Sequence, residues 1–182
     1  RIIRRNRRGG VARAKNTCLR CLADFNFEFG FIVEDDALFR PGWACKYAEA
    51  SARTGVHHFS WAQDHGYKDR MKKKVVEVNG YPIVRANMVN GVLLTVTPKM
   101  IEVLGGFRIG PHLWGHEHTN YTRRCVRAGF APFFADVCNS NDLVGLNSHS
   151  THTVFSRVEK RKGFRDNYEI MRNLKLRLPI TE

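Results

Sequence analysis

Three consecutive acidic residues, Glu34, Asp35 and Asp36, come directly after the apolar run Phe31-Ile32-Val33. Carboxylates at the end of a buried strand repel one another and lose solvation, so the arrangement is costly unless a cation lies among them. A single aspartate in this place would more often cap a turn. Three acids in a row favour a metal or catalytic site instead.

A second group with possible chemistry is His116-Glu117-His118, which has His112 four residues before its first histidine. Zinc-binding helices carry two histidines four apart around a glutamate, whereas here the second histidine follows the first by two. Pro111 favours a loop around His112, so a zinc hydrolase is the weaker alternative.

The elements that must position these residues follow from periodicity and turn residues. Helices are expected at about 10–24, 43–53, 97–105 and 116–128, and strands at 27–33, 56–62, 74–78, 81–85, 91–95 and 131–137. In the first helix, Val11, Ala14, Cys18 and Leu22 recur at helical spacing and predict its apolar face. Asn79-Gly80 is the preferred two-residue turn of a hairpin. Thr97-Pro98 is a strong helix start, with a hydroxyl cap followed by proline at the first helical position. Residues 139–153 are polar and are expected to form a loop.

Alternating helices and short strands predict an α/β fold with a mixed sheet flanked by helices. The length of 182 residues and the 43% hydrophobic content suit one core, so we expect a single domain.

Four sequence blocks resemble glycosyltransferases with the GT-A fold, especially glycosyltransferase family 2 and its galactosyltransferase-like relatives. Residues 31–36 resemble the apolar strand and Asp-x-Asp signature, and residues 9–16 resemble the upstream Gly, small, Ala-Arg-Asn segment. Residues 90–107 are similar to the strand, helix and Gly-Gly-Phe acceptor loop, and residues 114–118 to the Trp-Gly-x-Glu-Asp helix start. His118 stands where the family has aspartate.

The resemblance implies a Rossmann-like GT-A catalytic domain over residues 1–154 and a basic C-terminal helix or tail over 155–182. The first strand and helix of that family have no counterpart before Arg1. We therefore expect a catalytic-domain fragment that is partial at its N-terminus.

The resemblance also implies a metal-dependent hexosyltransferase that inverts the anomeric centre. The donor would be a nucleoside-diphosphate sugar, most simply a UDP-sugar, and the acceptor a glycan or another hydroxyl compound. The cofactor would be Mn²⁺ or Mg²⁺, since oxygen ligands suit both ions. Asp36 would bind the metal directly and Glu34 would assist it. His149 or His152 would supply a further ligand.

Other roles follow from the same family comparison. Arg13, Asn16 and Asp35 would contact the nucleotide sugar. Gly106, Phe107 and Trp114 would contact the acceptor. Glu117 would act as the base, with His118 as the competing candidate.

The net charge of +13 is large for a chain of 182 residues and raises an alternative function. Such a charge suits an anionic partner, and a nucleic-acid-binding module is the alternative of another class. No helix-turn-helix, zinc-finger or RNA-recognition pattern is present, so no specific nucleic acid is expected. The basic residues gather in 1–15 and 157–177, where contact with an anionic membrane surface is a further possibility.

The five cysteines include one Cys-x-x-Cys pair, Cys18 and Cys21, without a second pair in zinc-finger spacing. We expect reduced thiols and, with no apolar span or signal segment in view, a cytoplasmic protein. Because the sequence begins with Arg1 inside an apparent strand, we also expect the natural N-terminus to lie upstream.

Overall fold

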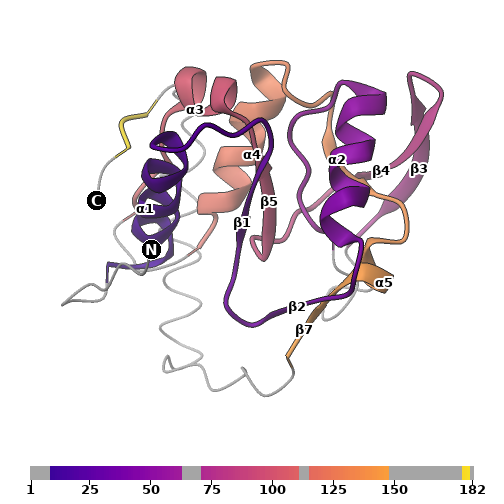
Figure 1. Ribbon diagram of the computed structural model, residues 1–182, viewed down its shortest axis with the longest axis horizontal. Helices are drawn as coiled ribbons and strands as arrows, with labels where there is room; N and C mark the ends of the chain where they lie inside the picture. The colour runs from indigo at the N-terminus through magenta and orange to yellow at the C-terminus, as the bar shows by residue number, and fades with distance from the viewer. Residues whose placement is uncertain (1–8, 63–70, 111–114, 148–177, 181–182) are drawn as a thin grey trace.

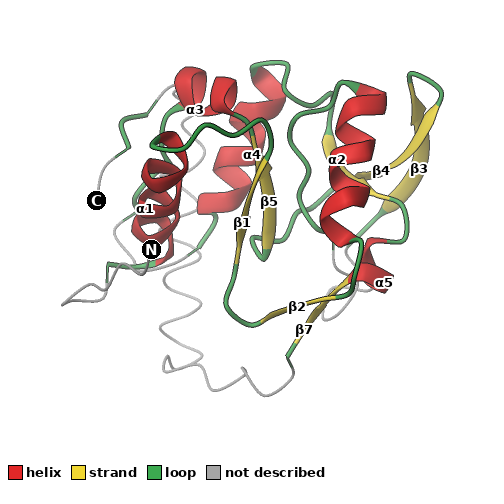
Figure 2. Cartoon of the chain, viewed as in Figure 1, coloured by secondary structure: helices red, strands yellow, loops and turns green. Residues whose placement is uncertain are grey.

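The computed structural model describes residues 9–62, 71–110, 115–147 and 178–180. Helices and strands are interspersed along this part of the chain (Figures 1 and 2). The helices are α1 (Val11–Ala23), α2 (Trp43–Thr54), α3 (Pro98–Leu104), α4 (Glu117–Arg127) and α5 (Ser140–Leu143). The strands are β1 (Gly30–Val33), β2 (Ala37–Phe39), β3 (Lys73–Val78), β4 (Tyr81–Ala86), β5 (Leu93–Val96), β6 (Phe134–Val137) and β7 (Val144–Leu146).

The strands form three small groups: β1 with β5, β2 with β7, and β3 with β4 and β6. The segment 57–62 joins the first group to the third through its backbone. The amide of Trp61 donates to Leu93 of β5 at 3.1 Å, and that of Ser60 donates to Ala135 of β6 at 2.9 Å. This mixed structure of helices and strands is compatible with the predicted α/β class, and the pairings of the named strands in the described residues are antiparallel. The strand expected at 56–62 is reduced to a bridge between Ser60 and Leu94.

The β1–β5 pair lies between two apolar cores. Helices α1, α3 and α4 lie on one side of it, and α2 and the β3–β4–β6 sheet on the other (Figure 1). Successive residues of a strand face opposite ways, so Ile32 and Leu94 belong to the helical core while Leu93 belongs to the second core. The position of β1, and of the acidic residues that follow it, therefore depends on the packing of both cores.

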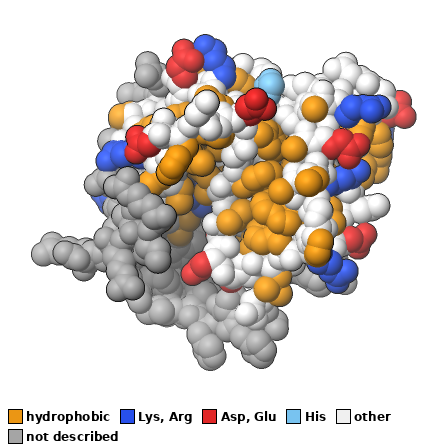
Figure 3. Space-filling model, viewed as in Figure 1, with side chains coloured by type: hydrophobic (Ala, Val, Ile, Leu, Met, Phe, Trp, Pro, Cys, Tyr) orange, Lys and Arg blue, Asp and Glu red, His pale blue; other side chains and the backbone are white. Residues whose placement is uncertain are grey.

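Aromatic rings fill the side of β1 that faces α2. Phe31 lies edge-on to Trp43 with ring centroids 4.6 Å apart, and Phe39 contacts the same indole at 4.2 Å. Figure 3 shows apolar side chains gathered on this face of the molecule. Val33 is 42% exposed, so the prediction of a buried strand is wrong at its last residue.

Helix α1 buries a different face from the one predicted. Its buried residues are Ala12, Lys15, Asn16 and Leu19, which follow the i, i+3, i+4, i+7 pattern of one helix face. Ala14 and Cys18, expected to face the core, are exposed. Two polar residues therefore occupy the core-facing stripe, and the contacts that stabilise them there belong to the candidate site.

Several local predictions are confirmed. Asn79 and Gly80 both have positive φ, at 50° and 74°, as a two-residue hairpin turn between β3 and β4 requires. The hydroxyl of Thr97 accepts from the amide of Met100 at 3.3 Å and caps α3. The predicted loop at 139–153 is wrong in its first part, which forms α5 and β7. None of the described helices is long and apolar enough to cross a membrane.

The buried polar groups of the second core are satisfied by hydrogen bonds. The Asp136 carboxylate accepts from the hydroxyls of Tyr47 at 2.8 Å and Ser140 at 2.6 Å, and from the amides of Ala62 and Val137 at 2.8 Å each. Burial still raises the pKa of Asp136, because those donors offset the lost hydration only in part. The carboxylate ties β6 to α2, α5 and the segment 57–62.

His58 is a buried imidazole between β5 and α4. Its Nδ1–H donates to the carbonyl of Thr95 at 2.8 Å, so its Nε2 accepts from the hydroxyl of Thr122 at 2.9 Å. Burial lowers the pKa of His58 to about 4 from the ordinary 6.5. The folded protein therefore holds this ring neutral in a pH range where the unfolded chain would protonate it.

We expect the His58 contribution to stability to be present above pH 6.5 and to be lost as the pH falls towards about 4. The expected loss is about 3 kcal/mol in the free energy of unfolding. Urea titrations at neutral and acid pH should show it in the wild type and much less in His58→Gln, whose amide does not titrate. An equal pH dependence in both proteins would contradict the assignment.

Candidate functional site

The acidic turn after β1 is anchored by backbone contacts. The amide of Glu34 donates to Val92 at 2.9 Å, and that of Asn147 donates to the carbonyl of Asp36 at 2.9 Å. Glu34 falls on the same strand face as Ile32, so its side chain is directed towards the helical core. Asp35 is exposed, and Asp36 is half-buried with its Oδ1 atom shielded from solvent. The three carboxylates therefore have three different environments.

Lys15 of α1 contacts the first residue of the acidic turn. Its side chain is 4% exposed, and its Nζ lies 3.3 Å from Oε1 of Glu34 and 3.5 Å from Oε1 of Glu117. The same Nζ donates to the carbonyl of Gly91 at 2.9 Å and lies 5.9 Å from the centre of the Phe107 ring. One ammonium thus joins α1, the end of β1, the turn before β5 and the start of α4.

Glu117 begins α4 on its buried face, together with Tyr121 and Arg124 at the following turns. Its Oε2 accepts from the amide of Gly115 at 3.0 Å, and its Oε1 lies 3.2 Å from Nδ1 of His118. The carboxylate is therefore engaged at both oxygens. The His118 ring is 21% exposed on its side-chain atoms, so it is the more accessible member of the pair.

The electrostatics of Glu117 favour its ionised form. Burial raises the pKa of this carboxyl, but the hydrogen bond and charge of His118, followed by the charge of Lys15, lower it more. The net result is a pKa well below the ordinary 4.5. A carboxylate held so strongly in its charged form is a weak proton acceptor near neutral pH.

The Gly106–Phe107 loop is fixed by contacts to its backbone. The amide group of Asn16 accepts from Phe107 N at 2.6 Å and donates to Phe107 O at 3.1 Å. The buried Arg124 guanidinium donates to the carbonyls of Leu104 at 2.8 Å and Gly106 at 2.5 Å. The Phe107 ring is 1% exposed and stacks on Tyr121. A Cβ at Gly106 would lie 2.8 Å from Oδ1 of Asn16, so the loop requires glycine there.

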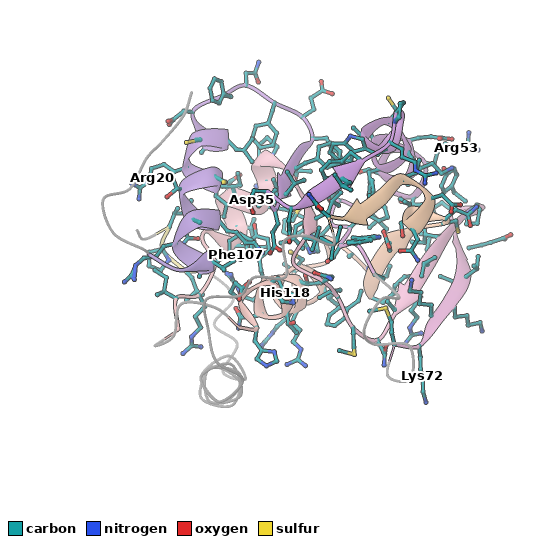
Figure 4. The ribbon with its side chains drawn as sticks, turned by 90° about the horizontal axis from the view of Figure 1, so that it is seen from below. Arg20, Asp35, Arg53, Lys72, Phe107 and His118 are labelled. Atoms are coloured by element: carbon teal, nitrogen blue, oxygen red, sulfur yellow. The ribbon has the colours of Figure 1, made fainter. Side chains whose placement is uncertain are left out.

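The structure brings together only part of the predicted site. Within the described residues, Glu34, Glu117, His118 and the Phe107 ring converge on Lys15, and Figure 4 shows Asp35, Phe107 and His118 in the central region of the molecule. Arg13 is half-buried on α1. Asn16 is buried, and its side chain bonds to the backbone of Phe107. The predicted metal ligands His149 and His152 lie outside the described residues, as does Trp114, the predicted acceptor contact.

A cavity of about 170 Å³ lies on the neighbouring face of α4. Its lining combines hydrogen-bonding and apolar side chains. They are Asn87, Met88, Val89, His116, Thr119, Asn120, Arg123 and Phe134. Burial lowers the pKa of His116, which lies at the junction between this cavity and the cluster around Glu117.

The acidic turn fits a divalent cation by its donor chemistry. Mg²⁺ and Mn²⁺ bind one or two carboxylates and take their remaining ligands from substrate phosphates and water. Asp35 and Asp36 offer such oxygens, and Lys15 offsets one of the three adjacent negative charges. The described residues contain no group of three histidine, cysteine or acidic side chains arranged around a common metal position. Cys18 and Cys21 are free thiols.

Sequence reasoning missed Lys15 and Gly91. The signal for Lys15 was its place three residues after Ala12 and four before Leu19, on the stripe that turned out to be buried. A lysine on such a stripe needs a partner of opposite charge. Gly91 gave no sequence signal of its own, because its lack of a side chain matters only once Lys15 and His118 are in place.

Comparison with known proteins gives one informative match. The chain is 32% identical over 161 residues to an uncharacterized glycosyltransferase of Acanthamoeba polyphaga mimivirus. The matched region is 87% of this chain and 62% of that protein, so the chain spans less than two thirds of its relative. No protein-family model and no solved structure matches the chain.

We expect Glu117→Gln to lower the free energy of unfolding by about 2 kcal/mol at neutral pH, because the buried Lys15 loses an anionic neighbour. The depressed pKa of Glu117 makes its contribution fully present above pH 4.5 and lost as the pH falls below that value. Denaturant titrations of the two proteins should therefore converge in acid. Glu102→Gln is the control, because its pair with Lys99 is solvent-exposed and should contribute less than about 1 kcal/mol.

Proposed function

We propose that this chain carries the catalytic part of a GT-A glycosyltransferase that transfers a sugar from a nucleoside-diphosphate donor to an acceptor hydroxyl. The similarity to a protein named as a glycosyltransferase supports the general class. The observation that carries the finer proposal is the convergence of Glu34 and Glu117 on one buried ammonium. That contact brings an acidic turn suited to a metal diphosphate within a few ångströms of two candidate bases.

On the donor side, Asp36 would bind Mn²⁺ or Mg²⁺, with Asp35 and Glu34 beside it. The bound ion would supply charge neutralisation to the leaving diphosphate. The exposed position of Asp35 and the half-buried position of Asp36 support this division, since one carboxylate is open to an incoming substrate. Arg13, half-buried on α1, would add a positive charge towards the diphosphate. His149 and His152 remain candidate ligands.

On the acceptor side, His118 is the better proton acceptor of the two candidates. The ionised carboxylate of Glu117 has no hydrogen to donate, so Nδ1 of His118 is the donor in this contact. In the neutral ring, Nε2 then carries the lone pair. Glu117 would hold the ring in this tautomer, which is a common role of a buried carboxylate beside histidine.

The reaction then balances as a direct displacement. The acceptor oxygen forms a bond to the anomeric carbon while the bond from that carbon to the diphosphate oxygen breaks. The electron pair of the broken bond leaves with the nucleoside diphosphate, and the hydroxyl proton goes to Nε2 of His118. A single displacement inverts the anomeric centre. Gly106, Phe107 and Trp114 would shape the acceptor side through the loop that precedes α4.

Donor binding is tested by calorimetry with a panel of nucleotide sugars, with and without Mn²⁺. We expect metal-dependent binding of a UDP-sugar that weakens about 100-fold or more in Asp36→Ala. Asp24→Ala is the matched control, because Asp24 is an exposed aspartate at the end of α1. Absence of binding to every nucleotide sugar, with Mn²⁺ and with Mg²⁺ in its place, would overturn the proposal. Salt-sensitive binding to arbitrary DNA in its place would favour the nucleic-acid-binding alternative.

The base is tested by comparing transfer in two variants. His118→Gln should lower kcat by about 100-fold or more while donor binding is retained, because the proton acceptor is lost. Glu117→Gln leaves the imidazole of His118 in place and should therefore lose less activity than His118→Gln. A larger loss in Glu117→Gln than in His118→Gln, at a temperature where circular dichroism shows both variants folded, would assign the base to Glu117.

A further inference from the structure

Lys15 is a buried cation with more than one anionic partner. Its side chain is 4% exposed, and Glu34 and Glu117 each place one carboxylate oxygen within 3.5 Å of Nζ. These two glutamates come from the end of β1 and the start of α4 and are 83 residues apart in the sequence. A buried lysine is costly unless paired, so the pairing is a feature that the fold maintains.

The environment of Nζ is fitted to this one ammonium. A Cβ at Gly91 would lie 2.7 Å from Nζ of Lys15 and 3.0 Å from Nδ1 of His118. Gly91 does not have a positive φ, so a side chain there would be opposed by these two neighbouring side chains and not by backbone conformation. The Gly91 carbonyl accepts from the same Nζ at 2.9 Å. The backbone approaches the lysine and the histidine together, which keeps both in one place.

The two carboxylates belong to the two halves of the proposed reaction. Glu34 adjoins the aspartates proposed to meet the metal, and Glu117 contacts the proposed base. From this arrangement we propose that Lys15 is a positioning residue: it holds Glu117 against His118 for transfer and competes with the divalent cation for Glu34. This inference rests on the proposed function and adds a residue and a direction of effect to it.

The competition has a sign that a purely structural role would not produce. An ammonium 3.3 Å from Oε1 of Glu34 occupies that oxygen and makes the potential at the acidic turn more positive. Removal of the ammonium should therefore strengthen binding of a cation at the turn. General damage to the site would weaken that binding. The effect on transfer should be the opposite, because Glu117 loses a contact that fixes it beside His118.

The test measures binding of Mn²⁺ alone by electron paramagnetic resonance in the wild type, Lys15→Met and Lys99→Met. Methionine keeps the unbranched stem of Lys15 and removes its charge. We expect Lys15→Met to bind Mn²⁺ about tenfold more tightly than the wild type. Lys99→Met is the control, because it removes the same charge from an exposed pair with Glu102. In Lys15→Met/Glu34→Gln, the tighter binding should disappear.

Kinetics provide the second readout. In Lys15→Met we expect kcat for transfer to fall about 10- to 100-fold, with no rise in the donor KM. Circular dichroism and thermal unfolding identify a variant that fails to fold, and Gly91→Ala then tests the same contact by displacing the ammonium instead of deleting it.

The outcomes separate the two proposals. Wild-type donor binding with unchanged or weaker Mn²⁺ binding in Lys15→Met would overturn the role of Lys15 and leave the proposed function standing. Tighter Mn²⁺ binding in Lys15→Met without any donor binding would support the competition and overturn the transferase proposal. No Mn²⁺ binding in any of the proteins would overturn the competition, and the donor-binding experiment would then decide the proposed function by itself.

Discussion

The burial of the Lys15 ammonium between Glu34 and Glu117 is the interaction on which the candidate site depends. Each partner comes from a different element, and those elements meet where their charges can be paired. Apolar packing alone would allow α1 and α4 to slide along the β1–β5 pair, since hydrophobic contact is not directional. The ion pairs and the bond to Gly91 are directional, so they specify one arrangement of the helices around the acidic turn.

The second constraint is the position of the β1–β5 pair between two cores. Its neighbours on one side are helices, and on the other side are aromatic rings and the β3–β4–β6 sheet. Each core is closely packed, so a change of volume in either one moves the strand that carries the acidic turn. The site is therefore sensitive to residues that are distant from it and that have no chemistry of their own.

Much of the fold could be predicted because local signals agreed with the final structure. The Asn79-Gly80 turn and the Thr97-Pro98 start act through backbone conformation and capping, which neighbouring residues determine. The segment 56–62 was predicted as a strand from its apolar content, but its hydrogen bonds go to two partners over a short stretch. That arrangement depends on tertiary contacts that local sequence does not encode.

The face of α1 was predicted incorrectly for a physical reason. Periodicity searches assume that buried residues are apolar, and here the buried stripe contains Lys15 and Asn16. Local rules often fail at functional sites, because polar side chains are buried there for their interactions. The acidic turn and the Glu117-His118 pair were identifiable from residue type and order. Their common contact with a lysine 19 residues before Glu34 was not, since it exists only in the folded chain.

The support of the loop after α3 has a consequence for how the protein can diverge. Asn16, Arg124 and Leu178 all bind main-chain atoms of residues 104–107, so the course of this loop is independent of most side chains that follow it. Arg108 and Ile109, directly after the anchored part, are only partly buried. Substitutions there can alter what the loop presents to solvent without loss of the anchor. Related chains can therefore change the residues exposed after the loop, and so what those residues bind, while the backbone of residues 104–107 keeps its course.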